Sequence, residues 1–280
     1  MRRIIVLNQK GGVGKTTTVA NLGACLADLG KQVLVVDVDP QANLSLHLGV
    51  DAQRGQPSLY TLIRGEHEAG EVVRPTSMQG LSLIPSNLDL AGLSVELRED
   101  RQRLFVLRGV LDAMPGFDYV LMDSPPSLGL LTLNAMCAAR EVFIALQTEF
   151  FALQGVGKLL GTVRRVRGVN PRLTVSGVVA CMYDVRTRLA QEILADIREH
   201  FGPRVFNTVI RSNVRLAEAP GFGQAIIQYD DTCHGAQDYR ALAQEVEAMH
   251  DAPSGRSEVV PDDATDHDGT PVNGERHDSR

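Results

Sequence analysis

The 280-residue sequence has no tryptophan, few aromatic residues and little cysteine. The four cysteines are widely separated, without C-x-x-C spacing: Cys25, Cys137, Cys181 and Cys233. We expect buried free thiols and no zinc or iron–sulfur site. No apolar run reaches the ~18 residues of a membrane span, and the first apolar run begins too early for a signal peptide to precede it. These absences argue against a disulfide-rich secreted protein and a membrane-spanning protein, and predict a cytoplasmic one.

The net charge of −6 is distributed unevenly. Residues 251–280 carry eight acidic and three basic side chains and almost no large apolar ones, which predicts a disordered acidic tail. Residues 1–250 are nearly neutral and form the expected single domain. Within them, residues 158–215 contain eleven Lys or Arg against four Asp or Glu, a pattern typical of a polyanion-binding surface. The tail either only solvates the protein or competes with a polyanion for this surface.

Apolar runs alternate with helical patterns through residues 1–250. Strands are expected at residues 4–7, 33–36, 81–85, 119–123, 141–146, 173–181 and 204–210. Helices are expected at residues 16–29, 41–50, 88–114, 153–167, 189–201 and 236–249. Residues 51–80 and 211–229 lack clear periodicity and are expected to be irregular. Near-continuous apolar strands alternating with helices predict an α/β fold with a doubly wound, mostly parallel sheet flanked by helices.

A glycine-rich loop follows the first strand directly. It reads Lys10-Gly11-Gly12-Val13-Gly14-Lys15-Thr16-Thr17. Glycines allow backbone N–H groups to converge on an anion, and the start of the following helix adds positive potential. The order of strand, glycine-rich loop, Lys-Thr and helix therefore predicts a phosphate-binding loop for a polyphosphate.

Two side chains of this loop and one distant aspartate have expected roles. Lys15 should lie along the β- and γ-phosphates, and the Thr16 hydroxyl should bind Mg²⁺. Asp123, at the end of an apolar run, is placed to hold that ion through water. Singly, such a loop can be only a turn and such an aspartate only a helix cap. The match to G-x-x-x-x-G-K-[ST] is also incomplete, because Gln9 replaces the first glycine.

Three motifs, in this order, resemble the deviant Walker A ATPases of the ParA/MinD superfamily. They are residues 8–17, Asp37-Val38-Asp39-Pro40-Gln41 and Asp123-Ser124-Pro125-Pro126-Ser127. Two later motifs, residues 182–187 and 213–220, narrow the resemblance to the chromosomal ParA (Soj) branch. The similarity covers residues 3–249. It implies a P-loop NTPase fold and a DNA-segregation ATPase that uses ATP and Mg²⁺.

The resemblance also implies an ATP-dependent homodimer. Lys10 matches the lysine that reaches the partner's phosphates, and Gly11 matches a glycine that must stay small where the two loops meet. Asp39 matches the residue that positions the attacking water, with Asp37 as a supporting acidic residue near the metal. Met182 is a candidate for packing on the adenine. Hydrolysis is expected to be slow, because a complete site forms only in the dimer.

The resemblance also implies a function, DNA binding, for the basic residues 158–215. Arg186 and Arg215 match DNA-binding arginines, and Arg211 is a weaker candidate. Arg164, Arg165, Arg167 and Arg188 are candidates by charge alone. Contacts to phosphates bind duplex DNA without sequence preference, although a single arginine is equally often a solvated or ion-paired surface side chain. The resemblance implies nonspecific double-stranded DNA and a ParB-type centromere-binding protein as partners, and a nucleoid-associated location.

The chain departs from the family pattern at three positions. Arg211 and Ser212 stand where a proline and an arginine are common, which leaves the adenine contacts less defined than the phosphate contacts. Ala42 replaces the usual glycine after Asp-Pro-Gln, a change that we expect to be tolerated.

Other functions on the same fold stay open. A MinD-like membrane-associated ATPase would end in a basic amphipathic helix, which the acidic residues 251–280 do not provide. A metabolic synthetase that uses ATP to activate a carboxylate is compatible with the composition. An iron–sulfur reductase would need cluster-binding cysteines in loops, whereas Cys137 and Cys181 lie in apolar runs.

Overall fold

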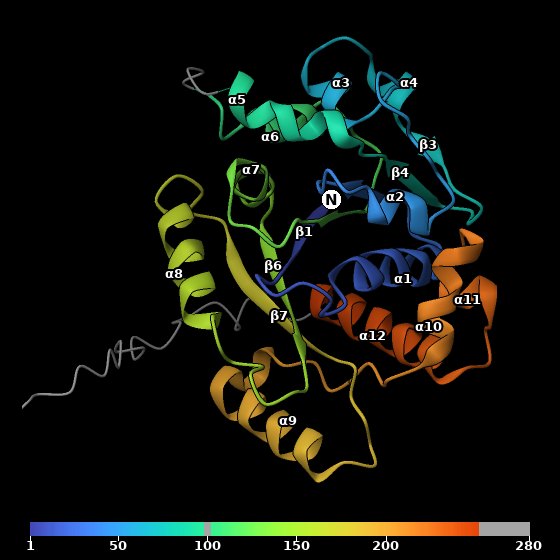
Figure 1. Ribbon diagram of the computed structural model, residues 1–280, viewed down its shortest axis with the longest axis vertical. Helices are drawn as coiled ribbons and strands as arrows, with labels where there is room; N and C mark the ends of the chain where they lie inside the picture. Colours follow the sequence, from blue (N-terminus) through green and yellow to red (C-terminus); the bar gives the residue numbers. More distant parts are fainter. Residues whose placement is uncertain (98–101, 252–280) are drawn as a thin grey trace, which may run out of the picture.

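The computed structural model describes residues 1–97 and 102–251, and a seven-stranded sheet forms its centre (Figure 1). The strands are β1 (Arg2–Leu7), β2 (Val33–Asp37), β3 (Arg74–Pro75), β4 (Leu81–Ile84), β5 (Tyr119–Asp123), β6 (Glu141–Gln147) and β7 (Thr174–Cys181). Their order is β3-β4-β2-β5-β1-β6-β7, and only the β3–β4 pair is antiparallel. The acidic tail predicted at residues 251–280 lies outside the described residues from residue 252 onward.

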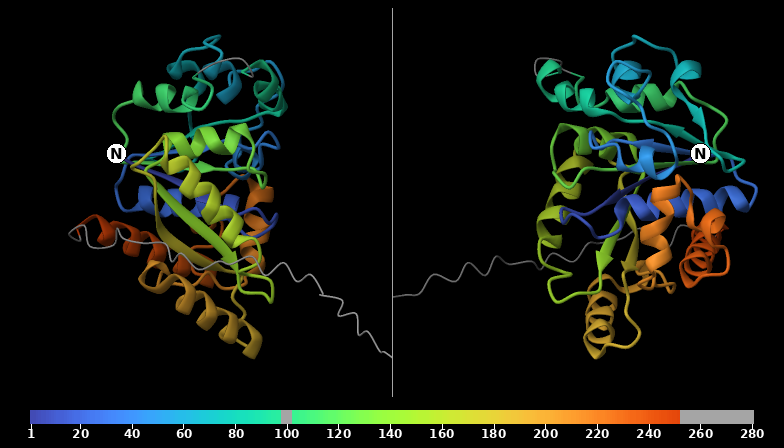
Figure 2. Two further views of the ribbon diagram at one scale, coloured as in Figure 1. Left: turned by 90° about the vertical axis from the view of Figure 1, so that its left-hand side faces the viewer. Right: turned by 45° about the vertical axis from the view of Figure 1, so that its right-hand side comes forward.

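Helices connect the strands and cover both sheet faces (Figure 2). The α-helices are α1 (Lys15–Asp28), α2 (Asn43–His47), α3 (Leu59–Ile63), α4 (Ala69–Val72), α5 (Leu93–Glu96), α6 (Val106–Asp112), α7 (Leu130–Ala138), α8 (Val156–Arg167), α9 (Arg188–Phe201), α10 (Val214–Glu218), α11 (Ile226–Tyr229) and α12 (His234–Asp251). Short 3₁₀ helices are η1 (Leu88–Gly92), η2 (Gly202–Arg204) and η3 (Ala219–Phe222).

Alternation along the strands divides the core into two layers. Ile4 and Val6 of β1 pack with buried residues of α1, α2 and α12, whereas Ile5 and Leu7 pack with those of α6, α7 and α8. Successive strand side chains point to opposite faces, so a strand that is buried on both sides must be apolar throughout. The predicted doubly wound α/β fold is confirmed.

The predicted strand at residues 204–210 is wrong. The amides of Phe206 and Ile210 donate to Val178 and Ala180 of β7, so four residues of this segment span two residues of the strand. The segment therefore bulges away from the sheet, and only an isolated bridge forms at Val205. The amides of Asn207 and Thr208 instead donate to Glu245 of α12, which compensates in part for the missing strand pairing.

Four further regions differ from the sequence predictions. The helix predicted over residues 88–114 consists, where described, of η1, α5 and α6, because no apolar residue stands between Leu97 and Leu104 to hold a continuous helix on the sheet. Helix α7 was missed because it is apolar on nearly every side and so shows no periodicity. Residues 51–80, expected to be irregular, contain α3, α4 and β3, and residues 211–229, also expected to be irregular, contain α10, η3 and α11. Each of these elements is at most five residues long, too short to show a period in the sequence. Of the cysteines, Cys233 is partly exposed rather than buried.

The alanine at position 42 has left-handed backbone geometry, with φ 56° and ψ 30°, directly before α2. A side chain in this region costs about 1 kcal/mol that glycine avoids. Ala42→Gly is therefore expected to raise the free energy of unfolding by about 1 kcal/mol in urea denaturation. Ala195→Gly, on the exposed face of α9, should lower it by a similar amount (~1 kcal/mol). Destabilisation by both changes would contradict this account.

Candidate nucleotide site and basic surface

The phosphate loop joins β1 to α1 in a conformation that requires glycine. Gly12 and Gly14 have φ values of 73° and 94°, where other residues are strained. Gly14 precedes the first residue of α1, and a Cβ atom on it would lie 3.5 Å from the sulfur of Cys181. The loop therefore lies close to the end of β7, and the N-terminus of a 14-residue helix faces it.

The structure brings Lys15, Thr16 and Asp123 together, as the sequence predicted. Thr16 Oγ1 donates a hydrogen bond to Asp123 Oδ2 at 2.6 Å, and Lys15 Nζ donates to the Lys10 carbonyl oxygen at 3.1 Å. Burial lowers the pKa of Lys15, and the carboxylates of Asp123 and Asp39 oppose that shift. A hydroxyl beside a carboxylate offers the oxygen ligands that suit Mg²⁺. The Lys15 ammonium places a positive charge beside this pair.

Two carboxyl groups lie side by side at the end of the sheet. Asp37 and Asp123 are register partners on β2 and β5, and both are buried. Burial raises the pKa of Asp37 to about 6, and burial together with the neighbouring charge of Asp37 raises the pKa of Asp123 to about 8. Asp37 keeps its charge more readily, because Ser45 donates both its amide and its hydroxyl to Oδ2 at 2.9 and 2.7 Å.

Asp39 follows this pair at the same edge of the sheet. It is 8% exposed, and its Oδ1 accepts the amide of Gln41 at 3.0 Å. The Asp39 amide in turn donates to Asp37 Oδ1 at 3.1 Å, so the two aspartates form one hydrogen-bonded turn. This geometry keeps the Asp39 carboxylate next to Lys15 and Asp123 instead of in bulk solvent.

Lys10 differs from Lys15 in where its charge lies. Its side chain is 48% exposed, and Nζ is 3.2 Å from Glu149 Oε2, which is 56% exposed. Only its backbone takes part in the loop, with the amide donating to Asn8 Oδ1 at 3.0 Å. At Gly11, a Cβ atom would meet no described atom within 4 Å. The start of the loop therefore faces outward.

Sequence reasoning missed two residues of this region, Ser45 and Glu149. Ser45 belongs to no recognisable motif. Its importance is visible only in the structure, where it donates hydrogen bonds to Asp37. Glu149 follows β6, the neighbour of β1, so the strand order would have placed it beside the phosphate loop. A sheet order cannot be read from spacing alone.

Met182 lies at the same edge of the sheet, next to the β7 cysteine that faces Gly14. It has a positive φ of 55° and is 38% exposed. Its carbonyl oxygen accepts from the hydroxyls of Thr148 and Ser212 at 3.4 and 3.5 Å. The side chain is thus available for an adenine ring, while that role stays a prediction.

The motifs that carry Arg186 and Arg215 are adjacent in space. The Tyr183 amide donates to Ile210 O, and the Ser212 amide donates to Tyr183 O, both at 3.0 Å. Both arginines are exposed: Arg186 pairs with Asp184 at 2.8 Å and Arg215 with Glu218 at 2.8 Å. Such exposed pairs contribute little energy and can be exchanged for phosphate contacts.

Arg211, the weaker candidate, has a different environment. Its guanidinium and its amide both bind the carboxylate of Asp238 on α12, which is largely buried. A two-pronged ion pair of this kind fixes the side chain against the protein. Its DNA-binding role stays a prediction that the geometry does not favour.

The described part of the chain lacks two kinds of feature. Residues 1–97 and 102–251 contain no cluster of three or more His, Cys, Asp or Glu side chains suited to a metal ion. The Thr16–Asp123 pair could hold a magnesium ion together with water and phosphate oxygens. Over the same residues, no helix combines the length and apolarity needed to cross a membrane.

Known proteins resemble this chain over most of its length. A family model described as an AAA domain matches residues 1–175. The chromosome-partitioning ATPase Soj of Thermus thermophilus is 52% identical over 249 residues, covering 89% of this chain and 96% of that protein. The chromosome partitioning protein ParA of Caulobacter vibrioides is 46% identical over 250 residues, covering 88% of this chain and 94% of that protein.

Solved structures agree on the fold. Cobyrinic acid a,c-diamide synthase from Mycobacterium smegmatis, with bound ADP and magnesium, matches with a TM-score of 0.79 and 36% identity. The match covers 91% of this chain and 97% of that one. Sequence identity is higher to the partitioning proteins, over nearly the same length. The chain therefore belongs to the ParA/Soj family of chromosome-partitioning ATPases, within the ParA/MinD superfamily, as its motifs predicted.

Proposed function

We propose that this protein is a DNA-segregation switch driven by ATP and Mg²⁺. ATP binding joins two protomers face to face, the dimer binds duplex DNA without sequence preference at Arg186 and Arg215, and hydrolysis releases it. A ParB-type centromere-binding protein and DNA stimulate the slow hydrolysis. The protein is accordingly nucleoid-associated, and membrane binding is not part of the proposal.

The contrast between the two loop lysines carries this proposal. Lys15 is buried among Asp123, Asp39 and the Lys10 carbonyl, whereas the Lys10 side chain is at the surface and pairs only with exposed Glu149. A lysine that served its own phosphates would be expected within the loop. The outward position supports a role across a dimer interface, where a second ammonium would stabilise the transferring phosphoryl group.

Residues within one protomer bind the phosphates and the metal and orient the attacking water. Lys15 and the amides of residues 11–17 bind the phosphates, and Thr16 and Asp123 provide ligands for the metal, directly and through water. Mg²⁺, when bound, neutralises phosphate oxygens. Asp39 orients the attacking water, and Asp37 fixes Asp39 through the amide hydrogen bond at 3.1 Å. The chemistry depends on position and charge, as phosphoryl transfer generally does.

Turnover assays test the proposal as a whole. ATP hydrolysis should be measured for the protein alone, with nonspecific duplex DNA, and with the cognate ParB-type protein. We expect weak basal turnover that DNA and the partner together raise. A high basal rate that neither one changes would contradict a switch.

Gly11→Val separates a dimer interface from a purely internal loop. Because a Cβ atom at Gly11 meets no described atom within 4 Å, the variant should fold with an unchanged melting temperature. In the proposed dimer the two loops meet there, so ATP-dependent dimerisation should weaken at least tenfold (about 1.4 kcal/mol) in analytical ultracentrifugation. Gly161→Val on α8, also without a neighbour within 4 Å, is the control. Normal dimerisation of the Gly11 variant would refute the loop contact.

Arg186→Glu with Arg215→Glu tests the DNA surface. Each lost phosphate contact reduces the dependence of log K on log salt by about 0.9, so the double variant should bind duplex weakly and with a shallower slope. Fluorescence anisotropy across a salt series gives both quantities. Arg54→Glu, 74% exposed in its side chain and outside the basic segment, is the matched control. Equal loss in both variants would indicate a general charge effect instead of a DNA site.

A metabolic synthetase is the second candidate function. The structural match to cobyrinic acid a,c-diamide synthase favours it, because that enzyme shares the fold at 36% identity. A synthetase has a second small substrate, whose addition would raise ATP turnover without DNA or a protein partner. The 46–52% identity to partitioning proteins makes the switch the better-supported proposal.

A further inference from the structure

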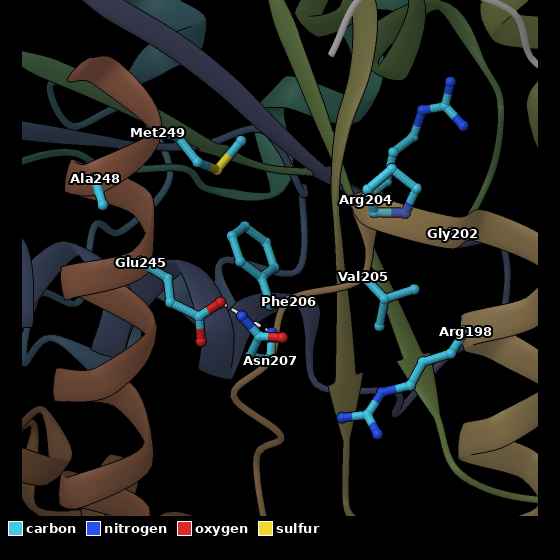
Figure 3. Close-up of a pocket in the computed structure, with 10 residues that line it drawn as sticks. Arg198, Gly202, Arg204, Val205, Phe206, Asn207, Glu245, Ala248 and Met249 are labelled. Atoms are coloured by element: carbon cyan, nitrogen blue, oxygen red, sulfur yellow. Dashed lines mark hydrogen bonds between the residues drawn. The ribbon is translucent and has the colours of Figure 1, made fainter. Parts of the chain in front are cut away.

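A cavity of about 460 Å³ lies between α9, η2 and the last turns of α12 (Figure 3). Arg198 extends into this region from α9, and Ala248 and Met249 face it from α12. Val205 and Phe206, in the segment that bulges away from β7, form the apolar floor between them. None of these residues belongs to the nucleotide site.

The charged residues around the cavity leave its rim basic. Arg198 and Arg204 line the side formed by α9 and η2. The single acidic lining residue, Glu245, is already engaged, because its carboxylate accepts the amides of Asn207 and Thr208 at 2.9 and 2.6 Å. An occupant should therefore combine carboxylates with a small apolar surface.

The C-terminal segment, residues 252–280, has this combination and follows α12, whose residues Ala248 and Met249 line the cavity. It carries seven acidic and three basic side chains, and it follows Met249 by only three residues. Its one pair of adjacent branched apolar residues is flanked by acids, in Glu258-Val259-Val260-Pro261-Asp262-Asp263. Position 258 lies seven Cα–Cα steps beyond Asp251, and these steps can span up to ~24 Å, enough for the chain to return to the cavity.

We propose that residues 258–263 dock in this cavity of the same chain. The carboxylates lie beside Arg198 and Arg204, and the two valines cover the apolar floor. Tethering gives the segment an effective concentration near the millimolar range, so individually weak contacts suffice. The segment is thus an internal ligand of the protein.

Docking has a consequence that rests on the proposed DNA binding. Arg198 and Arg204 belong to the basic residues 158–215, and a docked acidic segment lowers the positive potential that attracts a polyanion. Removing the negative charges of this segment with Glu258→Gln, Asp262→Asn and Asp263→Asn should therefore raise the affinity of the protein for DNA. If neither form binds DNA, the proposed function fails while docking is still decided by the next experiment.

Disulfide trapping in the full-length chain tests the docking itself. Asn207→Cys at the cavity is paired with Ala264→Cys just after the docking residues, or with Asn273→Cys further along, all in a Cys233→Ser background. In an undocked chain, the shorter loop should make the disulfide at position 264 form only about twice as fast as the one at position 273. Docking should raise this rate ratio to about tenfold or more, and the product should be monomeric.

Two arginine variants make the result specific. Arg198→Glu should return the ratio to about twofold, whereas Arg167→Glu, also an exposed arginine in the last turn of a helix, should leave it high. A ratio near two in the starting background would overturn the proposal. So would a dimeric cross-linked product, which would indicate a second copy as the occupant.

Discussion

Lys10→Ala is expected to lower the DNA- and partner-stimulated ATPase rate about 10³-fold, the size of effect that a charge supplied in trans has in phosphoryl transfer. Nucleotide binding by the protomer should change little, because the Lys10 side chain pairs with Glu149 at the surface while Lys15 lies in the loop. Lys15→Ala should instead abolish nucleotide binding. Single-turnover hydrolysis and equilibrium titration with a fluorescent nucleotide measure the two effects separately.

Mixing variants shows whether the lysine acts across the dimer. Lys10→Ala retains its own Asp39, and Asp39→Asn retains its own Lys10, so a mixed dimer has one complete site. At a 1:1 ratio, half of the dimers are mixed, and activity should recover to about a quarter of wild type. Lys158→Ala, an exposed lysine on α8, is the control and should stay active. No recovery on mixing would show that Lys10 acts within its own protomer.

The parts of the site that the sequence predicted are those with fixed local spacing. Gly14, Lys15 and Thr16 are consecutive, and a strand followed by a helix leaves the loop few conformations. Asp123 was predictable because it ends an apolar run, and parallel strands end at one edge of a sheet. The positions of these residues follow from the local sequence, so they could be predicted without knowing the contacts between distant segments.

The features that the sequence did not predict depend on strand order and on competing hydrogen bonds. Glu149 lies beside Lys10 only because β6 adjoins β1, a neighbour relation that spacing does not encode. Residues 204–210 have the composition of a strand, but two of their backbone amides donate hydrogen bonds to Glu245 of α12 instead of to a neighbouring strand. Long-range contacts of this kind override local propensity.

The buried carboxyl pair makes the metal-free protein less stable as pH rises. The folded-state pKa values of Asp37 and Asp123, about 6 and about 8, lie above the ordinary value of 3.8, so the folded protein binds protons more tightly than the unfolded chain. Their contribution to stability is therefore complete below pH 4 and is lost as pH rises to about 8. Mg²⁺ with nucleotide should offset this loss, because it compensates the same negative charge.

Asp123→Asn and Asp37→Asn should consequently have opposite effects on stability. Asparagine at position 123 can still bond Thr16 and the Ser124 amide without a buried charge, so unfolding at pH 8 should cost about 2 kcal/mol more than in wild type. Asparagine at position 37 loses an acceptor for Ser45 and should destabilise by a similar amount (~2 kcal/mol). Urea denaturation without metal at pH 5 and pH 8 measures both, with the exposed Asp196→Asn as the control. Destabilisation by Asp123→Asn at pH 8 would show that this carboxyl is ionised and compensated even without metal.

Asp123→Asn should also reduce Mg²⁺-dependent turnover about 10²-fold, since it removes a charge that holds the metal.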